Sequence, residues 1–347
     1  MMSKRSVFIL LICLLVLSSV AIYLYYSKGT TTTATDASRN FAFKDTASVN
    51  RVFIADKEGN SAEVKRTSRG WIVNNKYNCR GEAILNLLEV IRNVEVKMPV
   101  PRQAKENVIR IMAAAALKVE VYANDKLVKQ YYVGHETSDG EGSYMLLSDH
   151  RSGKNFADPY VCFIPGFTGY LQPRFIAKEH EWRDRLAINY IPPEIAGVEM
   201  YYPGMPDSSF TIELKSTTEF RLTDGNKKPL PFEEFKMKQY LAYLQNLSYE
   251  VLITDKYPHL QDSLKKAGPF CQLTITAKPF RKDVFSFYRM KFSGQFNPEL
   301  GVTYDSDPDR LYMNFSGRKE WAIVQYFVMG KLFRHSGYFN SDGSVKK

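Results

Sequence analysis

The residue types best suited to bind a metal ion lie in two acidic segments. Residues 135–142 read His-Glu-Thr-Ser-Asp-Gly-Glu-Gly, and residues 305–309 read Asp-Ser-Asp-Pro-Asp. Carboxylates at alternate positions are among the oxygen ligands that Ca²⁺ takes. An EF-hand loop starting at residue 305 would need glycine and glutamate where this chain has Arg310 and Ser316. Turns rich in Asp, Gly and Pro explain both segments without a metal, so we predict no metal site.

A third segment with ligand residue types is residues 180–184, His-Glu-Trp-Arg-Asp. It begins like the helical zinc motif of metalloproteases, which needs a second histidine one turn later on the same face. Position 184 is Asp, and the other histidines have no ligand spacing to His180. The pattern favours a charged segment in which Trp182 packs into a domain.

Motifs for nucleophilic or cofactor chemistry are absent from the sequence. It contains no Gly-x-Ser-x-Gly, no Cys-x-x-Cys, no P-loop and no dinucleotide fingerprint. Paired carboxylates for glycoside hydrolysis stay open, because they need not be neighbours in sequence. We therefore expect no cofactor, and we favour a non-enzymatic protein over a hydrolase with dispersed acidic residues.

The best candidate for contact with a partner or ligand is residues 166–175, Gly-Phe-Thr-Gly-Tyr-Leu-Gln-Pro-Arg-Phe. Aromatic, basic and glycine residues are mixed here, and such loops commonly carry binding functions. Phe167, Tyr170, Arg174 and the nearby Trp182 are the candidate contact residues. Large aromatic side chains are usually buried, so the favoured interpretation of Phe167, Tyr170 and Phe175 is that they plug the joint between two modules.

Basic and aromatic residues also alternate over residues 280–292. This resembles single-stranded nucleic-acid binders, but the alternation of an ordinary strand pair produces the same pattern. We predict no nucleic-acid partner. The net charge of +10 arises from interspersed charges and fits a solvated surface.

The cysteines do not predict a disulfide. Cys162 and Cys271 lie in apolar, strand-like stretches, where cysteine behaves as a small hydrophobe. Cys79 is the thiol that we expect to be most exposed, and its neighbour Arg80 could lower its pKa. A spare buried thiol is the simpler interpretation.

The first 26 residues predict a membrane anchor. Lys4 and Arg5 precede an uncharged run over residues 6–26 that ends in tyrosines, a pattern typical of a single-pass helix with its N-terminus in the cytoplasm. The alternative is a cleaved signal peptide with Ser19-Val20-Ala21 as its cleavage site. Residues 27–40 are small and polar and predict a flexible tether.

The rest of the chain shows one order of patterns twice. Alternating apolar stretches at residues 49–56 and 195–202 each precede two further strand-like stretches, two helical stretches and more strands. The first predicted helices carry Ile84, Leu87, Leu88 and Ile91, and Met237, Tyr240, Leu241 and Leu244, respectively. We predict an α+β fold with two tandem modules, residues 41–190 and 191–347, each a helix pair on an antiparallel or mixed sheet. Chance similarity of two unrelated domains is the alternative.

Several segments together resemble a known family. They are residues 70–74 (Gly-Trp-Ile-Val-Asn), 98–101 (Met-Pro-Val-Pro), 118–122, 129–134, 164–175 and 182–185 (Trp-Arg-Asp-Arg). This order resembles the Gram-negative envelope family known as domain of unknown function number 4340, over most of residues 40–255. The resemblance implies a membrane-anchored, envelope-facing protein and assigns no catalytic residue.

These observations favour a scaffold or partner-binding protein in the inner membrane, with residues 27–347 in the periplasm. A periplasmic module that binds or senses a glycan or lipid is the main alternative. Its ligand would lie near residues 166–175. The sequence does not indicate an oligomeric state.

Overall fold

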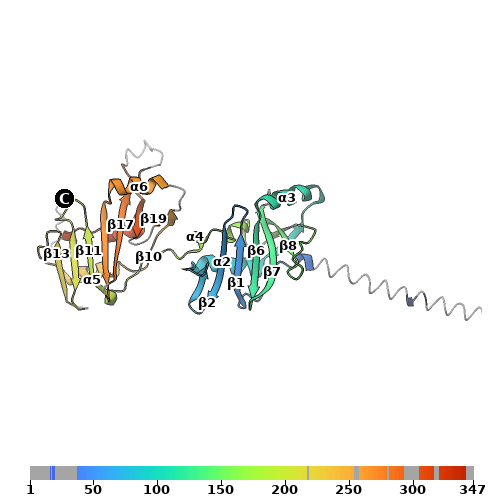
Figure 1. The fold of residues 1–347 in the computed structure, drawn as a ribbon, viewed down its shortest axis with the longest axis horizontal. Coiled ribbons are helices and arrows are strands. Elements are labelled where there is room, and N and C mark those ends of the chain that lie inside the picture. Colours follow the sequence, from blue (N-terminus) through green and yellow to red (C-terminus); the bar gives the residue numbers. More distant parts are fainter. Residues whose placement is uncertain are drawn as a thin grey trace, which may run out of the picture. The chain divides into compact units, whose positions relative to one another are not determined.

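The computed structural model describes residues 16, 18, 19, 37–216, 219–253, 258–279, 281–292, 305–315 and 320–340. The chain divides into two compact units, residues 1–184 and 185–347 (Figure 1). The boundary expected from the sequence, between residues 190 and 191, falls inside the second unit.

The first unit is built on one nine-stranded sheet in the order β4-β3-β2-β1-β6-β7-β8-β9-β5. Its elements are β1 (Val49–Ala55), β2 (Ser61–Thr67), β3 (Gly70–Val73), β4 (Tyr77–Asn78), α2 (Gly81–Asn93), β5 (Glu95–Pro99), α3 (Arg102–Ala115), β6 (Leu117–Ala123), β7 (Lys126–Glu136), β8 (Ser143–Ser148), β9 (Tyr160–Phe163), η1 (Gln172–Arg174) and α4 (Glu179–Trp182). Every neighbouring pair of strands is antiparallel.

The second unit is built on an eight-stranded sheet in the order β13-β12-β11-β16-β17-β18-β19-β15. A separate two-stranded sheet pairs β10 with β14. Its elements are β10 (Leu186–Ile188), η2 (Pro192–Glu194), β11 (Ile195–Tyr201), β12 (Phe210–Leu214), β13 (Phe220–Asp224), α5 (Glu234–Ala242), β14 (Leu247–Ser248), β15 (Val251–Ile253), α6 (Pro258–Ala267), β16 (Cys271–Ala277), β17 (Arg281–Arg289), β18 (Arg310–Phe315), β19 (Trp321–Gln325), α7 (Tyr326–Met329), η4 (Gly330–Leu332) and η5 (Ser336–Phe339). These strand pairs are antiparallel too.

The two large sheets share one strand order, apart from the additional edge strand β4 of the first unit. They also share an irregularity of register. The β1–β6 ladder shifts between Val49 and Arg51, and the β11–β16 ladder shifts between Ile195 and Gly197. A bulge in the same strand of both sheets bends that strand and increases its local twist.

The two long helices of the first unit lie on opposite faces of its sheet. Alternate residues of a strand point to opposite faces, and neighbours on β7 fall into different apolar clusters. Tyr131 belongs to the main core with α2, whereas Tyr132 packs with Val108 and Met112 of α3. The main core is therefore covered by α2, and α3 covers a smaller cluster on the reverse face.

The second unit repeats this arrangement. Phe287 of β17 belongs to the main core, which includes residues of α5. Its neighbour Tyr288 packs with Trp321 and with Leu264 of α6 in a separate cluster. Both sheets are thus covered on one face by the first long helix and on part of the other face by the second.

These observations correct the expected fold class. The structure consists mainly of two large antiparallel sheets rather than an α+β arrangement, and neither sheet is mixed. The expected helix pair is split between two sheet faces. An amphipathic stripe shows that one side of a helix is buried, but it does not identify the face of the sheet that buries it.

The predicted transmembrane helix is also corrected. None of the helices in the described ranges is both long and apolar enough to cross a bilayer. This finding contradicts the single-pass anchor at residues 6–26 and the inner-membrane localisation that depended on it. Of residues 6–26, only 16, 18 and 19 belong to the described part, and residues 27–36 of the expected tether lie outside it.

Candidate functional site

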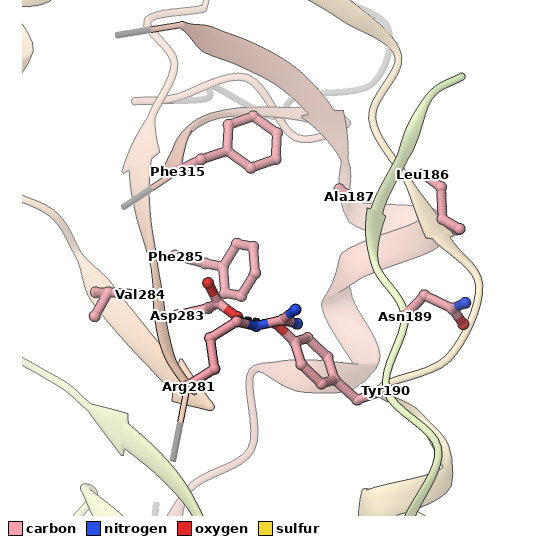
Figure 2. A pocket seen from close by; sticks show the side chains of 9 residues that line it. All are labelled: Leu186, Ala187, Asn189, Tyr190, Arg281, Asp283, Val284, Phe285 and Phe315. Atoms are coloured by element: carbon pink, nitrogen blue, oxygen red, sulfur yellow. Dashed lines mark hydrogen bonds and ion pairs between the residues drawn. The ribbon is translucent and has the colours of Figure 1, made fainter. Parts of the chain in front are cut away.

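A pocket of about 270 Å³ opens in the second unit. Its lining comes from β10 and the residues after it, and from the hairpin of β17 and β18. Figure 2 shows the side chains that line it: Leu186, Ala187, Asn189, Tyr190, Arg281, Asp283, Val284, Phe285 and Phe315. One part of the lining is a polar group of tyrosine, aspartate and arginine, and the rings of Phe285 and Phe315 form an apolar part.

Strand alternation brings most of this lining together. Arg281, Asp283 and Phe285 are alternate residues of β17, so their side chains share one side of the strand. Phe315 lies opposite Phe285 on β18, with the ring centroids 6.2 Å apart in an edge-on arrangement. The hairpin alone therefore places two charged groups beside two phenyl rings.

Tyr190 reaches the pocket from a distant part of the sequence. It follows β10, which pairs with β14, and its backbone N–H donates a hydrogen bond to the carbonyl oxygen of Leu244 at 2.9 Å. These backbone contacts hold the segment against the unit, so the ring is buried while its hydroxyl faces β17.

Three hydrogen bonds join the polar side chains. The Tyr190 hydroxyl donates to Oδ2 of Asp283, and Nε of Arg281 donates to the same oxygen at 2.7 Å. Nη2 of Arg281 donates to the tyrosine oxygen at 3.1 Å. The guanidinium also lies 5.4 Å from the centre of the tyrosine ring. This triangle fixes all three groups relative to one another.

The tyrosine of this network is protonated at neutral pH. Burial, and next the hydrogen bond to Asp283, raise the pKa of Tyr190 to about 12. The phenol therefore keeps its proton at neutral pH, whereas an effective general base has a pKa near the working pH. Among the residues that the structure describes, the lining contains no histidine, cysteine, lysine or serine.

The predicted contact loop of the first unit has its own geometry. Gly166 and Gly169 adopt φ angles of 79° and 128°, which strongly favour glycine. The Arg174 guanidinium lies 4.2 Å from the centre of the Phe167 ring and forms an ion pair with Glu89. The structure thus brings together Phe167 and Arg174, which are both half-buried and lie near the two ends of this loop.

Tyr170 lies apart from that pair in the lining of another pocket. Its side chain is 38% exposed and borders a space of about 310 Å³ in the first unit. Polar neighbours in that lining are Asp56, Gln172, Lys178 and Glu181. Of the four predicted contact residues, Tyr170 is the most accessible.

Trp182 is a core residue of the first unit. Its side chain has no solvent exposure, and Nε1 donates a hydrogen bond to the carbonyl oxygen of Ile176 at 2.7 Å. It belongs to the same apolar cluster as Leu171 and Phe175. In this structure Trp182 packs in the core with residues of the loop and is not exposed for contact with a ligand.

In both acidic segments an aspartate carboxylate accepts hydrogen bonds from its own turn. Oδ1 of Asp139 accepts from the Thr137 hydroxyl and from the Glu141 N–H, and Oδ1 of Asp307 accepts from the backbone N–H of Asp309 and Arg310. Within the part of the chain that the structure describes, no group of three or more His, Cys, Asp or Glu side chains is placed to hold a metal ion.

The described cysteines are free thiols in apolar surroundings. Cys162 and Cys271 are buried, and Cys79 is half-buried. Burial raises the pKa of Cys79 to about 12, so the neighbouring arginine does not activate it. This thiol is protonated at neutral pH and is a poor nucleophile.

Sequence reasoning missed the pocket of the second unit. The spacing of Arg281, Asp283 and Phe285 in a predicted strand did carry a signal. It places two charged side chains on the same side of the strand as an apolar residue of the core. No local signal could have joined Tyr190 to them, since that contact depends on the path of the chain after β10.

Comparison with protein-family models, with curated proteins and with solved structures finds no match for this chain. The resemblance to domain of unknown function number 4340 therefore stays a prediction.

Proposed function

We propose that this chain is a non-enzymatic binding protein whose second unit holds a small ligand in the pocket of Figure 2. The observation that supports this most strongly is the Tyr190–Asp283–Arg281 network beside the Phe285 and Phe315 rings. Small-molecule sites commonly combine apolar walls with a few fixed polar groups. Here the polar groups are fixed before any ligand arrives, which reduces the entropy lost on binding.

A thermal-shift screen of a metabolite library against the full-length protein tests this proposal. The Ala187→Phe variant places a phenyl ring in the pocket and should abolish the stabilisation by any true ligand. Ala196→Phe is the matched control, because Ala196 is an equally half-buried alanine of the second unit that does not line this pocket.

A ligand that stabilises the parent and the Ala196→Phe protein but not the Ala187→Phe protein supports the proposal. Stabilisation that survives Ala187→Phe would place the ligand elsewhere. A compound that is chemically converted during the incubation would contradict the non-enzymatic function.

Partner binding by the first unit is a second candidate. It is favoured by the exposed Tyr170 and by the loop that carries Phe167 beneath Arg174. Crosslinking of tagged full-length protein in intact cells, followed by mass spectrometry, tests it. A recurrent protein partner that is lost with Tyr170→Ala or Phe167→Ala supports this function, and a partner retained by both variants contradicts this surface.

A further inference from the structure

The hydrogen-bonding capacity that remains in the pocket identifies the kind of group it fits. Oδ2 of Asp283 and the Tyr190 hydroxyl are occupied by the internal triangle. Among the described residues, Oδ1 of Asp283 and Nη1 of Arg281 have no hydrogen-bond partner. Neighbouring side chains therefore offer a carboxylate oxygen as acceptor and the two N–H groups of Nη1 as donors.

The charges of this pair balance. An anionic ligand would compete with Asp283 for the guanidinium and lie near a negative charge. A cationic ligand would compete with Arg281 for the carboxylate and lie near a positive charge. Like charges placed together at a binding surface weaken binding. A neutral group avoids both costs.

A hydroxyl group both donates and accepts a hydrogen bond. Two neighbouring hydroxyls on a ring could accept from Nη1 of Arg281 and donate to Oδ1 of Asp283. The carbon face of the same ring would then lie on the apolar wall formed by Phe285 and Phe315.

The volume limits the ligand to a small one. At about 270 Å³ the pocket lies just below the usual ~300–1,000 Å³ of sites for drug-sized ligands. It suits one ring rather than several.

We infer that the pocket recognises a single neutral, polyhydroxylated ring, that is, one sugar unit, either free or at the end of a glycan. This inference rests on the proposed function, because it names the ligand class of the same pocket.

Isothermal titration calorimetry of the full-length protein tests it. The neutral probes are glucose, galactose and N-acetylglucosamine, with glucuronate as the anionic and glucosamine as the cationic counterpart. We expect at least one neutral sugar to bind, and the charged counterparts to bind at least tenfold more weakly. The methyl glycoside and a disaccharide with the same terminal ring distinguish a free sugar from a glycan end.

Variants link the binding to the two free groups. Asp283→Asn and Arg281→Gln should each weaken sugar binding at least tenfold, because hydrogen bonds to charged groups are the strong ones. The control Glu213→Gln alters an exposed carboxylate of the same sheet whose nearest cation, Arg221, is 3.8 Å away, and it should leave the affinity unchanged. Circular dichroism identifies any variant that fails to fold, in which case Ala187→Phe replaces it.

The outcomes separate the inference from the proposed function. Tighter binding of glucuronate or glucosamine, or a metabolite of another class that requires Ala187, would overturn the sugar assignment and leave the pocket's function standing. Absence of any ligand sensitive to Ala187→Phe would overturn both.

Discussion

Asp283 is the residue that holds the candidate site together, because its Oδ2 atom accepts hydrogen bonds from both Tyr190 and Arg281. The pair Arg281–Asp283 lies near the surface, where an isolated ion pair contributes only about 0–1 kcal/mol. Its importance lies in orientation: the carboxylate fixes the guanidinium and the phenol in one geometry. Binding should therefore be more sensitive than stability to substitutions here.

Trp182 provides a test of the difference between support and contact. Trp182→Ala should lower the free energy of unfolding of the first unit by about 3–5 kcal/mol, because it removes a fully buried side chain. The control Tyr170→Ala, at a site that is 38% exposed, should cost about 1 kcal/mol or less. Chemical denaturation measures both. Equal losses would contradict the assignment of Trp182 to the core.

Lys129 predicts a pH dependence of stability. Its Nζ donates hydrogen bonds to the backbone and side-chain oxygens of Asn40, and burial lowers its pKa from 10.5 to about 8. Between these values the unfolded chain binds more protons at this site than the folded chain. The contribution of Lys129 to the free energy of unfolding should therefore rise from about pH 8 to about pH 10.5.

The comparison with Lys129→Met isolates this effect, because other titrations are shared by both proteins. The stability of the parent relative to the variant should increase between pH 7.5 and pH 10. A difference that stays flat over this range would show that the lysine is not perturbed by burial.

At the scale of elements, the two long helices of the first unit should differ in local stability. Helix α2 buries five residues, whereas α3 buries only Val108 and Met112. Few buried apolar contacts allow local opening. Backbone amides in the middle of α3 should therefore exchange with deuterium markedly faster than those in the middle of α2.

Mass-spectrometric hydrogen exchange under native conditions measures this difference. Met112→Ala should accelerate exchange in α3 further and leave α2 unchanged. Equal protection of the two helices in the parent protein would contradict the small interface of α3.

Particular elements show how far the sequence determined the fold. The stretches predicted at residues 49–56 and 195–202 are β1, Val49–Ala55, and β11, Ile195–Tyr201. Both strands could be predicted because the alternation of apolar residues is a local pattern. The placement of α3 on the reverse face of the sheet could not be predicted, since it depends on which strands Val108 and Met112 contact.

The site shows the same limit. Strand parity could have placed Arg281 and Asp283 beside Phe285. The third member, Tyr190, is ninety or more residues away and is brought to them by the β10–β14 pair and by its backbone bond to Leu244. The predicted Phe167 and Arg174 do meet, because they belong to one short loop.

At the scale of the whole molecule, each unit has its own core. One cluster contains residues 41–182 only, and another contains residues 188–339 only. Phe287→Ala, which removes a ring packed on Phe333 with centroids 4.9 Å apart, should destabilise the second unit by about 3–5 kcal/mol. Hydrogen exchange should show lost protection in residues 185–347.

Leu87→Ala is the matched substitution in the first core, since both side chains are fully buried. It should reduce protection in residues 37–184. Equal loss of protection in both units after either substitution would contradict two separate cores.

The central claim is that the second unit binds a small ligand in the pocket of Figure 2 without converting it. The most direct test is a methyl-resolved NMR titration of the full-length protein with a hit from the thermal-shift screen. The account predicts a saturable shift of the Ala187 methyl signal, unshifted Val52 and Ile54 signals in the first core, and a ligand spectrum unchanged after prolonged incubation. An unshifted Ala187 signal at saturation, or the appearance of product signals, would contradict it.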